Sequence, residues 1–341
     1  DSSTSRGLGD VYKRQVLVFV ANQVANIANG MSWQDILETM DKQNHLTIVL
    51  MTLLGLLGVL PMLLYDWVTL RVLEKQGKPK MPRQEFFLAA WITNTINNLA
   101  GFGGVVGASL RANFYGKQAD RKKVLATVSK VAVFMITGLS VWSLFTFVDV
   151  FFIQTESIFR SYWIWLLGGS FVAPVIFFFA YLKRRTLFSE FYPKGLVGLF
   201  FASFGQWTGA LTVFLLIGKL MGINVSLHSI YPMFIVATLI GMLTMVPGGM
   251  GTFDVLMILG MSQLAVRQNV AVVWLLYYRL FYYVVPFLTG ILLFITHTGV
   301  KVNRFLDNIP RLFFQKVAHI ILVSAVYFAG IMMVLLSTIT N

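Results

Sequence analysis

Long apolar runs alternate with short polar stretches along this chain, and the pattern predicts a series of membrane-spanning helices. An apolar segment of about 20 residues is long enough to cross a bilayer as an α-helix. Segments of that length occupy residues 46–70, 124–148, 162–182, 195–220, 270–296 and 317–339. We therefore expect an all-α protein that crosses the membrane several times.

Two further apolar segments, 86–110 and 231–265, are interrupted by glycine-rich breaks. Proline lacks a backbone donor and glycine gains little from helical order, so a helix does not continue through such a run. In a bilayer the break survives only where protein or a water-filled cavity satisfies the freed backbone groups. We predict helical hairpins whose tips include Gly103, Gly104, Pro247, Gly248, Gly249 and Gly251.

Basic residues indicate how the chain is threaded. Four polar loops carry most of the lysines and arginines: 71–85, 111–123, 183–194 and 301–316. The positive-inside rule places all four in the cytoplasm. This requires 86–110 to enter and leave the membrane on one face, as a re-entrant hairpin, and makes 231–265 a second hairpin that enters from outside. Simple crossings at both places would put loop 183–194 on the wrong face.

The same threading contains a repeat, because residues 46–182 and 195–339 each read as span, hairpin, span, span. Gly103 and Gly248 are 145 positions apart (248 − 103) and fall at matching places in the two halves. Hairpins that enter from opposite faces make the repeat inverted, which is a recurrent plan of transporters. The alternative is that glycine-rich breaks recur by chance in a helix-rich chain.

Composition agrees with a polytopic membrane protein. Hydrophobic residues make up 57% of the chain and charged residues 12%, with a mean hydropathy of +0.74; soluble domains are nearer a quarter charged. The net charge of +13 suits an anionic lipid leaflet and does not require nucleic acid as a partner. The absence of cysteine excludes disulfides and thiolate metal sites.

The N-terminal part differs in character from the rest of the chain. Residues 1–15 are polar and aperiodic, and we expect them to be a non-native leader rather than part of the fold. Residues 16–45 are expected to hold the remnant of a first helix and an acidic amphipathic segment. A polar-faced amphipathic helix is the alternative for 16–29.

Four ionisable residues at or near membrane depth are the main candidates for a site. Asp254 and Arg279 follow the second break, and Asp66 and Arg111 flank the first. A charge at the bilayer centre costs roughly 2.5–3.5 kcal/mol on insertion scales, so such residues usually have a function. Asp66 and Arg111 could instead lie at helix ends among the headgroups, and Arg279 could reach the surface.

Two uncharged polar residues complete the candidate set. Gln206 lies in the middle of an expected span, and Asn98 belongs to a group with Asn94 and Asn97 that could serve only to satisfy the hairpin backbone. No zinc-protease, Walker or dinucleotide-binding motif is present, and the histidines are scattered. We therefore predict neither a metal nor a cofactor.

Three motifs carry a resemblance to a known family. They are the Asn-rich approach to Gly-Phe-Gly-Gly at 101–104 with Arg111 after it, the run from Pro247 to Asp254, and the pattern Tyr-Arg-x-x-Tyr-Tyr-x-x-Pro at 278–286. Together they resemble the membrane region of the lysyl-phosphatidylglycerol synthase/flippase family, the multiple peptide resistance factors, over about residues 30–341.

The resemblance implies a multi-pass protein of the bacterial cytoplasmic membrane that moves lysyl-phosphatidylglycerol to the outer leaflet and protects against cationic antimicrobial peptides. Its partners would be anionic and lysyl-modified phospholipids, its own C-terminal synthase domain and, in a homo-oligomer, a second copy. Phosphatidylglycerol lysyltransferase activity would belong to that domain of the parent protein, outside this chain. Asp66 and Arg111 would match residues the family needs for flipping, whereas an acid is expected near Gln206.

Two other functions stay open. An ion-coupled transporter of a small solute would depend on a proton or sodium gradient. A membrane platform that only docks a soluble lysyltransferase would support lipid synthesis without translocation. Measuring lysyl-lipid in the outer leaflet, beside a separate synthase domain, discriminates among the three.

Overall fold

The computed structural model describes residues 33–74, 81–100, 104–116, 119–153, 158–243 and 251–298, which form helices with no strand among them. The all-α prediction is confirmed for this part of the chain. Several predicted elements lie outside the described residues: the expected leader, the remnant helix 16–29, the last span 317–339 and the hairpin-tip residues Gly103 and Pro247 to Gly249.

The α-helices are α2 (Trp33–Asp41), α3 (His45–Val59), α4 (Leu63–Glu74), α5 (Arg83–Ala100), α6 (Gly104–Phe114), α7 (Arg121–Ala132), α8 (Thr137–Val148), α9 (Trp163–Leu182), α10 (Pro193–Leu220), α11 (Leu227–Leu243), α12 (Thr252–Gln263), α13 (Gln268–Arg279) and α14 (Val285–Thr298).

Five helical stretches in the described part are long and apolar enough to cross a membrane. Large apolar side chains point outward from them; on α9, for example, Phe171, Val175 and Phe178 are each more than half exposed. Such a surface is favourable against hydrocarbon and unfavourable against water. The chain is therefore a multi-pass membrane protein. The stretches are His45–Glu74, Arg121–Ile153, Phe159–Leu182, Pro193–Leu220 and Gln268–Leu293.

A proline and several short irregular segments interrupt the hydrogen bonding of these stretches. At the proline, a side chain of a neighbouring helix satisfies the carbonyl that has lost its partner. Pro174 inside α9 has no N–H for the Ser170 carbonyl, and the Ser140 hydroxyl of α8 donates to that carbonyl at 2.8 Å. Unsatisfied backbone groups are costly in a bilayer, so this bond holds α8 against α9. The irregular segments are η1 (Leu60–Met62), η2 (Val133–Ile136), η3 (Asp149–Ile153), η4 (Ile158–Tyr162) and η6 (Leu280–Val284).

Glycines allow the central helices to approach closely. A Cβ built on Gly55 of α3 would lie 1.9 Å from the Phe281 carbonyl oxygen of η6, and one on Gly209 of α10 would lie 2.7 Å from the Gly58 carbonyl oxygen. Small residues at helix crossings increase van der Waals contact, which drives helix association in lipid. Helices α3 and α10 and segment η6 therefore form a closely packed centre.

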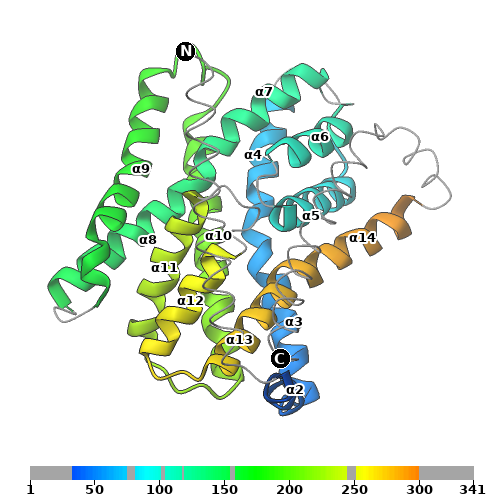
Figure 1. The fold of residues 1–341 in the computed structure, drawn as a ribbon. Coiled ribbons are helices and arrows are strands. Elements are labelled where there is room, and N and C mark those ends of the chain that lie inside the picture. The colour runs from blue at the N-terminus through cyan, green and yellow to red at the C-terminus, as the bar shows by residue number, and fades with distance from the viewer. Residues whose placement is uncertain are drawn as a thin grey trace, which may run out of the picture.

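The two glycine-rich segments fold as two pairs of neighbouring helices, α5 with α6 and α11 with α12 (Figure 1). The second helix of each pair is short, with 11 residues in α6 and 12 in α12. At 1.5 Å per residue these helices are roughly 17 Å long, well under the ~30 Å of a hydrocarbon core. Neither α6 nor α12 can cross the membrane by itself.

Two of the basic loops lie together. Glu190, in the turn between α9 and α10, pairs with Lys123 at 3.3 Å and Lys130 at 3.5 Å, both on α7. The start of α7 and the C-terminal end of α9 thus lie at one end of the molecule, uppermost in Figure 1, whereas α2 lies at the opposite end. This arrangement is the one that the positive-inside rule requires of these two loops.

Candidate functional site

Asp66 of α4 and Arg111 of α6 form a buried ion pair, called the first pair below. The Arg111 guanidinium donates from Nε to Asp66 Oδ1 and from Nη2 to Asp66 Oδ2, both at 2.7 Å. Asp66 is 0% exposed and Arg111 is 3% exposed. The two residues are thus enclosed by the surrounding helices, with Arg111 in the last turn of α6.

Asn94 and Tyr115 complete the hydrogen bonds of the first pair. The Asn94 amide donates to Asp66 Oδ2 at 2.6 Å, and its oxygen accepts from Arg111 Nη2 at 2.9 Å. The Tyr115 hydroxyl donates to Asp66 Oδ1 at 2.8 Å. Buried charges are tolerated when they are paired and hydrogen-bonded, so this network ties α4, α5 and α6 together.

Asp254 of α12 and Arg279 of α13 form a second ion pair, which the structure also brings together. Arg279 Nη2 lies 3.1 Å from both Asp254 oxygens, and Nε lies 3.2 Å from Oδ1. The Arg279 guanidinium also lies over the rings of Phe253 and Tyr283, 5.2 and 5.1 Å from their centroids. Cation–π contacts and the carboxylate together fix the position of this cation.

Asp254 also has a structural role at the start of α12. Its Oδ2 accepts a hydrogen bond from the Gly251 N–H at 3.0 Å, as a residue of a capping box does. Gly251 has φ +87°, which glycine adopts without strain. The predicted tip residue Gly251 therefore caps α12 directly before Thr252, whereas Gly104 is itself the first residue of α6.

The two pairs differ in access. The side chains of Arg279 and Asp254 are 18% and 26% exposed, whereas those of Arg111 and Asp66 are 4% and 0% exposed. The distances within the second pair are also longer. The second pair is thus partly accessible, whereas the surrounding helices enclose the first pair.

Gln206 and Asn98 contact neither pair through any hydrogen bond that the described residues show. Gln206 Oε1 of α10 accepts from the hydroxyl of Tyr65, the residue before Asp66, at 2.8 Å. Asn98 Nδ2 donates to the Tyr282 carbonyl at 3.4 Å. That carbonyl lies four residues before Pro286, which has no N–H to offer it. Asn98 thus supports the backbone of η6 rather than that of its own hairpin segment, 86–110.

Asn94 and Tyr115 are site residues that the sequence did not reveal. Tyr115 follows Arg111 by one helical turn, so this spacing could have indicated that the two side chains share a face. The sequence favours a role for Asn94 in supporting the hairpin backbone; it does bond the Ala90 carbonyl, but it also bonds Asp66. Only the tertiary packing shows the second contact.

The structure also shows a third polar cluster that was not predicted from the sequence. Asp149, at the start of η3, is 6% exposed and accepts a hydrogen bond from the Tyr231 hydroxyl of α11, with His228 Nδ1 at 3.8 Å. Asp149 directly follows the expected span 124–148. No group of three or more His, Cys, Asp or Glu side chains in the described part could hold a metal ion.

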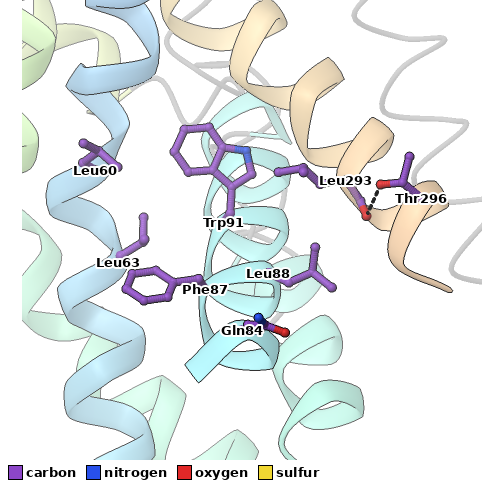
Figure 2. A pocket seen from close by; sticks show the side chains of 8 residues that line it. All are labelled: Leu60, Leu63, Gln84, Phe87, Leu88, Trp91, Leu293 and Thr296. Carbon is purple, nitrogen blue, oxygen red and sulfur yellow. Dashed lines mark hydrogen bonds between the residues drawn. The ribbon is translucent and has the colours of Figure 1, made fainter. Parts of the chain in front are cut away.

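An apolar groove opens between helices that carry residues of the first pair's network. It has a volume of about 610 Å³ and lies between the α3–α4 junction, α5 and α14 (Figure 2). Helices α4 and α5, which carry Asp66 and Asn94, form two of its walls. Its lining residues are Leu60, Leu63, Gln84, Phe87, Leu88, Trp91, Leu293 and Thr296.

Comparison with known proteins identifies the family. Residues 15–290 match the family model described as the lysylphosphatidylglycerol synthase TM region. The chain belongs to this family. Both ion pairs and both short helix pairs fall inside the matched residues.

Curated relatives in the family are longer proteins. The chain is 30% identical over 312 residues to a phosphatidylglycerol lysyltransferase of Bacillus subtilis (strain 168), covering 89% of this chain and 36% of the relative. It is 28% identical over 298 residues to a phosphatidylglycerol lysyltransferase of Staphylococcus aureus (strain COL), covering 86% and 34%. The chain thus spans about a third of the length of these relatives.

Proposed function

We propose that this domain moves lysyl-phosphatidylglycerol across the bacterial cytoplasmic membrane to the outer leaflet. The observation that carries the proposal is the presence of two arginine–carboxylate pairs among apolar helices. Each pair joins the short helix after a glycine-rich break to a neighbouring helix, α6 to α4 and α12 to α13. Charges in such surroundings are expensive and mark a path for polar substrates.

The chemistry of the pairs matches the headgroup. Lysyl-phosphatidylglycerol carries one phosphate and two ammonium groups. Arginine binds phosphate through two parallel N–H donors, and a carboxylate binds ammonium. A headgroup that enters a pair can therefore exchange the internal arginine–aspartate contact for two contacts of its own, without leaving a buried charge unpaired.

The helix pairs α5–α6 and α11–α12 would act as re-entrant hairpins in an inverted repeat. The short α6 and α12 support this, as does the position of an ionised residue on each of them. In the first half the hairpin carries the arginine, and in the second half it carries the aspartate. Broken helices that meet near the midplane are how many transporters form their substrate site.

The unequal access of the two pairs fits alternating access. A closed first pair and a partly exposed second pair are what one state of such a cycle requires. The basic residues of α7 and of the α9–α10 turn support an orientation with the first pair's end toward the cytoplasm. Arg279 and Asp254 would then serve the outward side of the path.

A membrane platform for a lysyltransferase is the second candidate. Two thirds of each curated relative lies beyond the match, and those relatives are named as lysyltransferases. A transferase domain in the full-length protein would be this domain's partner. In that case the domain would position lipid for synthesis without moving it.

Variants of the second pair test the function in the full-length parent protein. Arg279→Lys keeps the charge but loses the planar donor fork, and Asp254→Asn keeps the shape but loses the charge. Losing one charge-assisted contact of about 1.5 kcal/mol corresponds to roughly a tenfold change. We expect the ratio of outer-leaflet to total lysyl-lipid to fall about tenfold, at matched protein level and with unchanged total.

Two other outcomes of this experiment would count against translocation through the second pair. A wild-type ratio in both variants would make the second pair structural and contradict the proposal. A total lysyl-lipid level that falls in step with the exposed level would favour the platform. Co-expression of this domain with a separate synthase domain gives the complementary test, because translocation should then require the membrane domain.

A further inference from the structure

The groove between α4, α5 and α14 is lined mostly by apolar side chains. Leu60, Phe87 and Leu293 are 46%, 57% and 45% exposed, and they face outward from the bundle. The polar groups of two other lining residues are already bonded. The Thr296 hydroxyl donates to carbonyls of its own helix, and the Trp91 indole N–H donates to Thr289 Oγ1 at 3.2 Å.

The groove has a polar end and an apolar end. Figure 2 shows Gln84 at one end and Leu60 and Trp91 toward the other. Gln84 stands in the first turn of α5, next to the exposed Arg83 and the basic loop 71–85. An exposed amide and an exposed cation thus stand at the start of α5, followed by the half-buried Glu85, and the rings and leucines lie farther along the groove.

We propose that this groove holds one acyl chain of an anionic phospholipid, with the phosphate at the level of Gln84 and Arg83. Two of its walls, the α3–α4 junction and α14, belong to stretches that are long and apolar enough to cross a membrane, so we expect hydrocarbon around that side of the groove. An apolar hollow of about 610 Å³ in that medium would take a lipid chain, and the exposed Arg83, which precedes the lining residue Gln84, would complement a phosphate.

The groove would hold the lipid beside the first pair. On α4, Leu63 lines the groove one turn before Asp66, and on α5, Trp91 lines it three residues before Asn94. A chain held here keeps its headgroup at the ends of the same helices that carry the buried network. This role in delivery rests on the proposed translocation, but the binding of the chain does not.

Photocrosslinking in the full-length protein tests the binding. Benzoylphenylalanine replaces Phe87, and in a matched control it replaces Phe178, which is 64% exposed on α9. The protein is reconstituted with phosphatidylglycerol and phosphatidylethanolamine, extracted in detergent and washed to remove loosely bound lipid. After illumination we expect a phosphatidylglycerol adduct at position 87, at least fivefold more abundant than at position 178.

A different adduct at position 87 would overturn the proposal. A crosslink to a second copy would identify the groove as a subunit interface, and a crosslink to another peptide of the same chain would show that the protein covers it itself. Equal lipid adducts at both positions would reduce the groove to ordinary lipid-facing surface.

Filling the groove separates binding from translocation. Leu63→Trp places a ring in the groove, whereas Leu64→Trp alters the adjacent residue, which is 41% exposed and does not line it. We expect Leu63→Trp alone to reduce the adduct severalfold and to lower the exposed lysyl-lipid ratio. If the adduct falls but the ratio stays, the groove binds lipid and its role in delivery is wrong. If the adduct is unchanged, the assigned position of the chain is wrong.

Discussion

At the scale of single residues, the two ion pairs contain the same chemical groups in different surroundings. Asp66 accepts hydrogen bonds from Arg111, Asn94 and Tyr115, and none of it is exposed. Asp254 shares its carboxylate between Arg279 and the Gly251 N–H and remains a quarter exposed. Solvent or headgroups can compensate a change at Asp254, but not at Asp66.

This difference predicts unequal effects on stability. Asp66→Asn leaves the Arg111 charge buried without its counter-ion, and breaking a buried pair in this way typically costs about 3–5 kcal/mol. We expect its midpoint of thermal unfolding in detergent, followed by size-exclusion chromatography, to fall well below that of Asp254→Asn. Equal midpoints would mean that the first pair is hydrated in the protein.

At the scale of elements, close glycine contacts and side-chain hydrogen bonds stabilise the irregular segments between helices. Segment η6 follows Arg279 directly, and its Tyr282 carbonyl receives the Asn98 amide of α5. The same segment packs on Gly55 of α3. The position of Arg279 therefore depends on contacts made by two helices from the first half of the chain.

Gly55→Ala should disrupt this contact. Its Cβ would lie 1.9 Å from the Phe281 carbonyl oxygen, a backbone atom that cannot move without shifting η6. We expect a lower unfolding midpoint and a reduced exposed lysyl-lipid ratio. Gly168→Ala on α9 is the matched control, since nothing lies within 4 Å of its Cβ, and alanine favours helix by about 1 kcal/mol. A Gly55→Ala protein as stable as this control would contradict the close packing of α3 on η6.

At the scale of the whole molecule, the threading of the chain decides whether α5–α6 is a re-entrant pair. The absence of cysteine allows single cysteines to be labelled without background. Cysteines at Arg83, Lys122 and Arg185 should react only from the cytoplasm, and cysteines at Ile153 and Val225 only from outside, because the basic loops stay inside. Labelling of Arg83 and Lys122 from opposite faces would turn α5–α6 into a crossing.

Much of the fold could be predicted from the sequence, because hydrocarbon selects long apolar helices whatever their neighbours. All five described spans coincide with apolar segments, and the Gly-rich runs marked both short helix pairs. The last span and most tip residues lie outside the described part, so those expectations stay predictions. The inverted repeat likewise stays a prediction.

The sequence by itself determined which charges stand in or beside the apolar segments, since a carboxylate or guanidinium in an apolar run can be read directly from the sequence. Only the tertiary structure decided their partners. Asp66 and Arg111 are 45 residues apart, and Asn94 comes from a third helix. A buried charge must find its counter-ion and every remaining hydrogen bond in three dimensions, and helix packing alone sets which side chains come within reach.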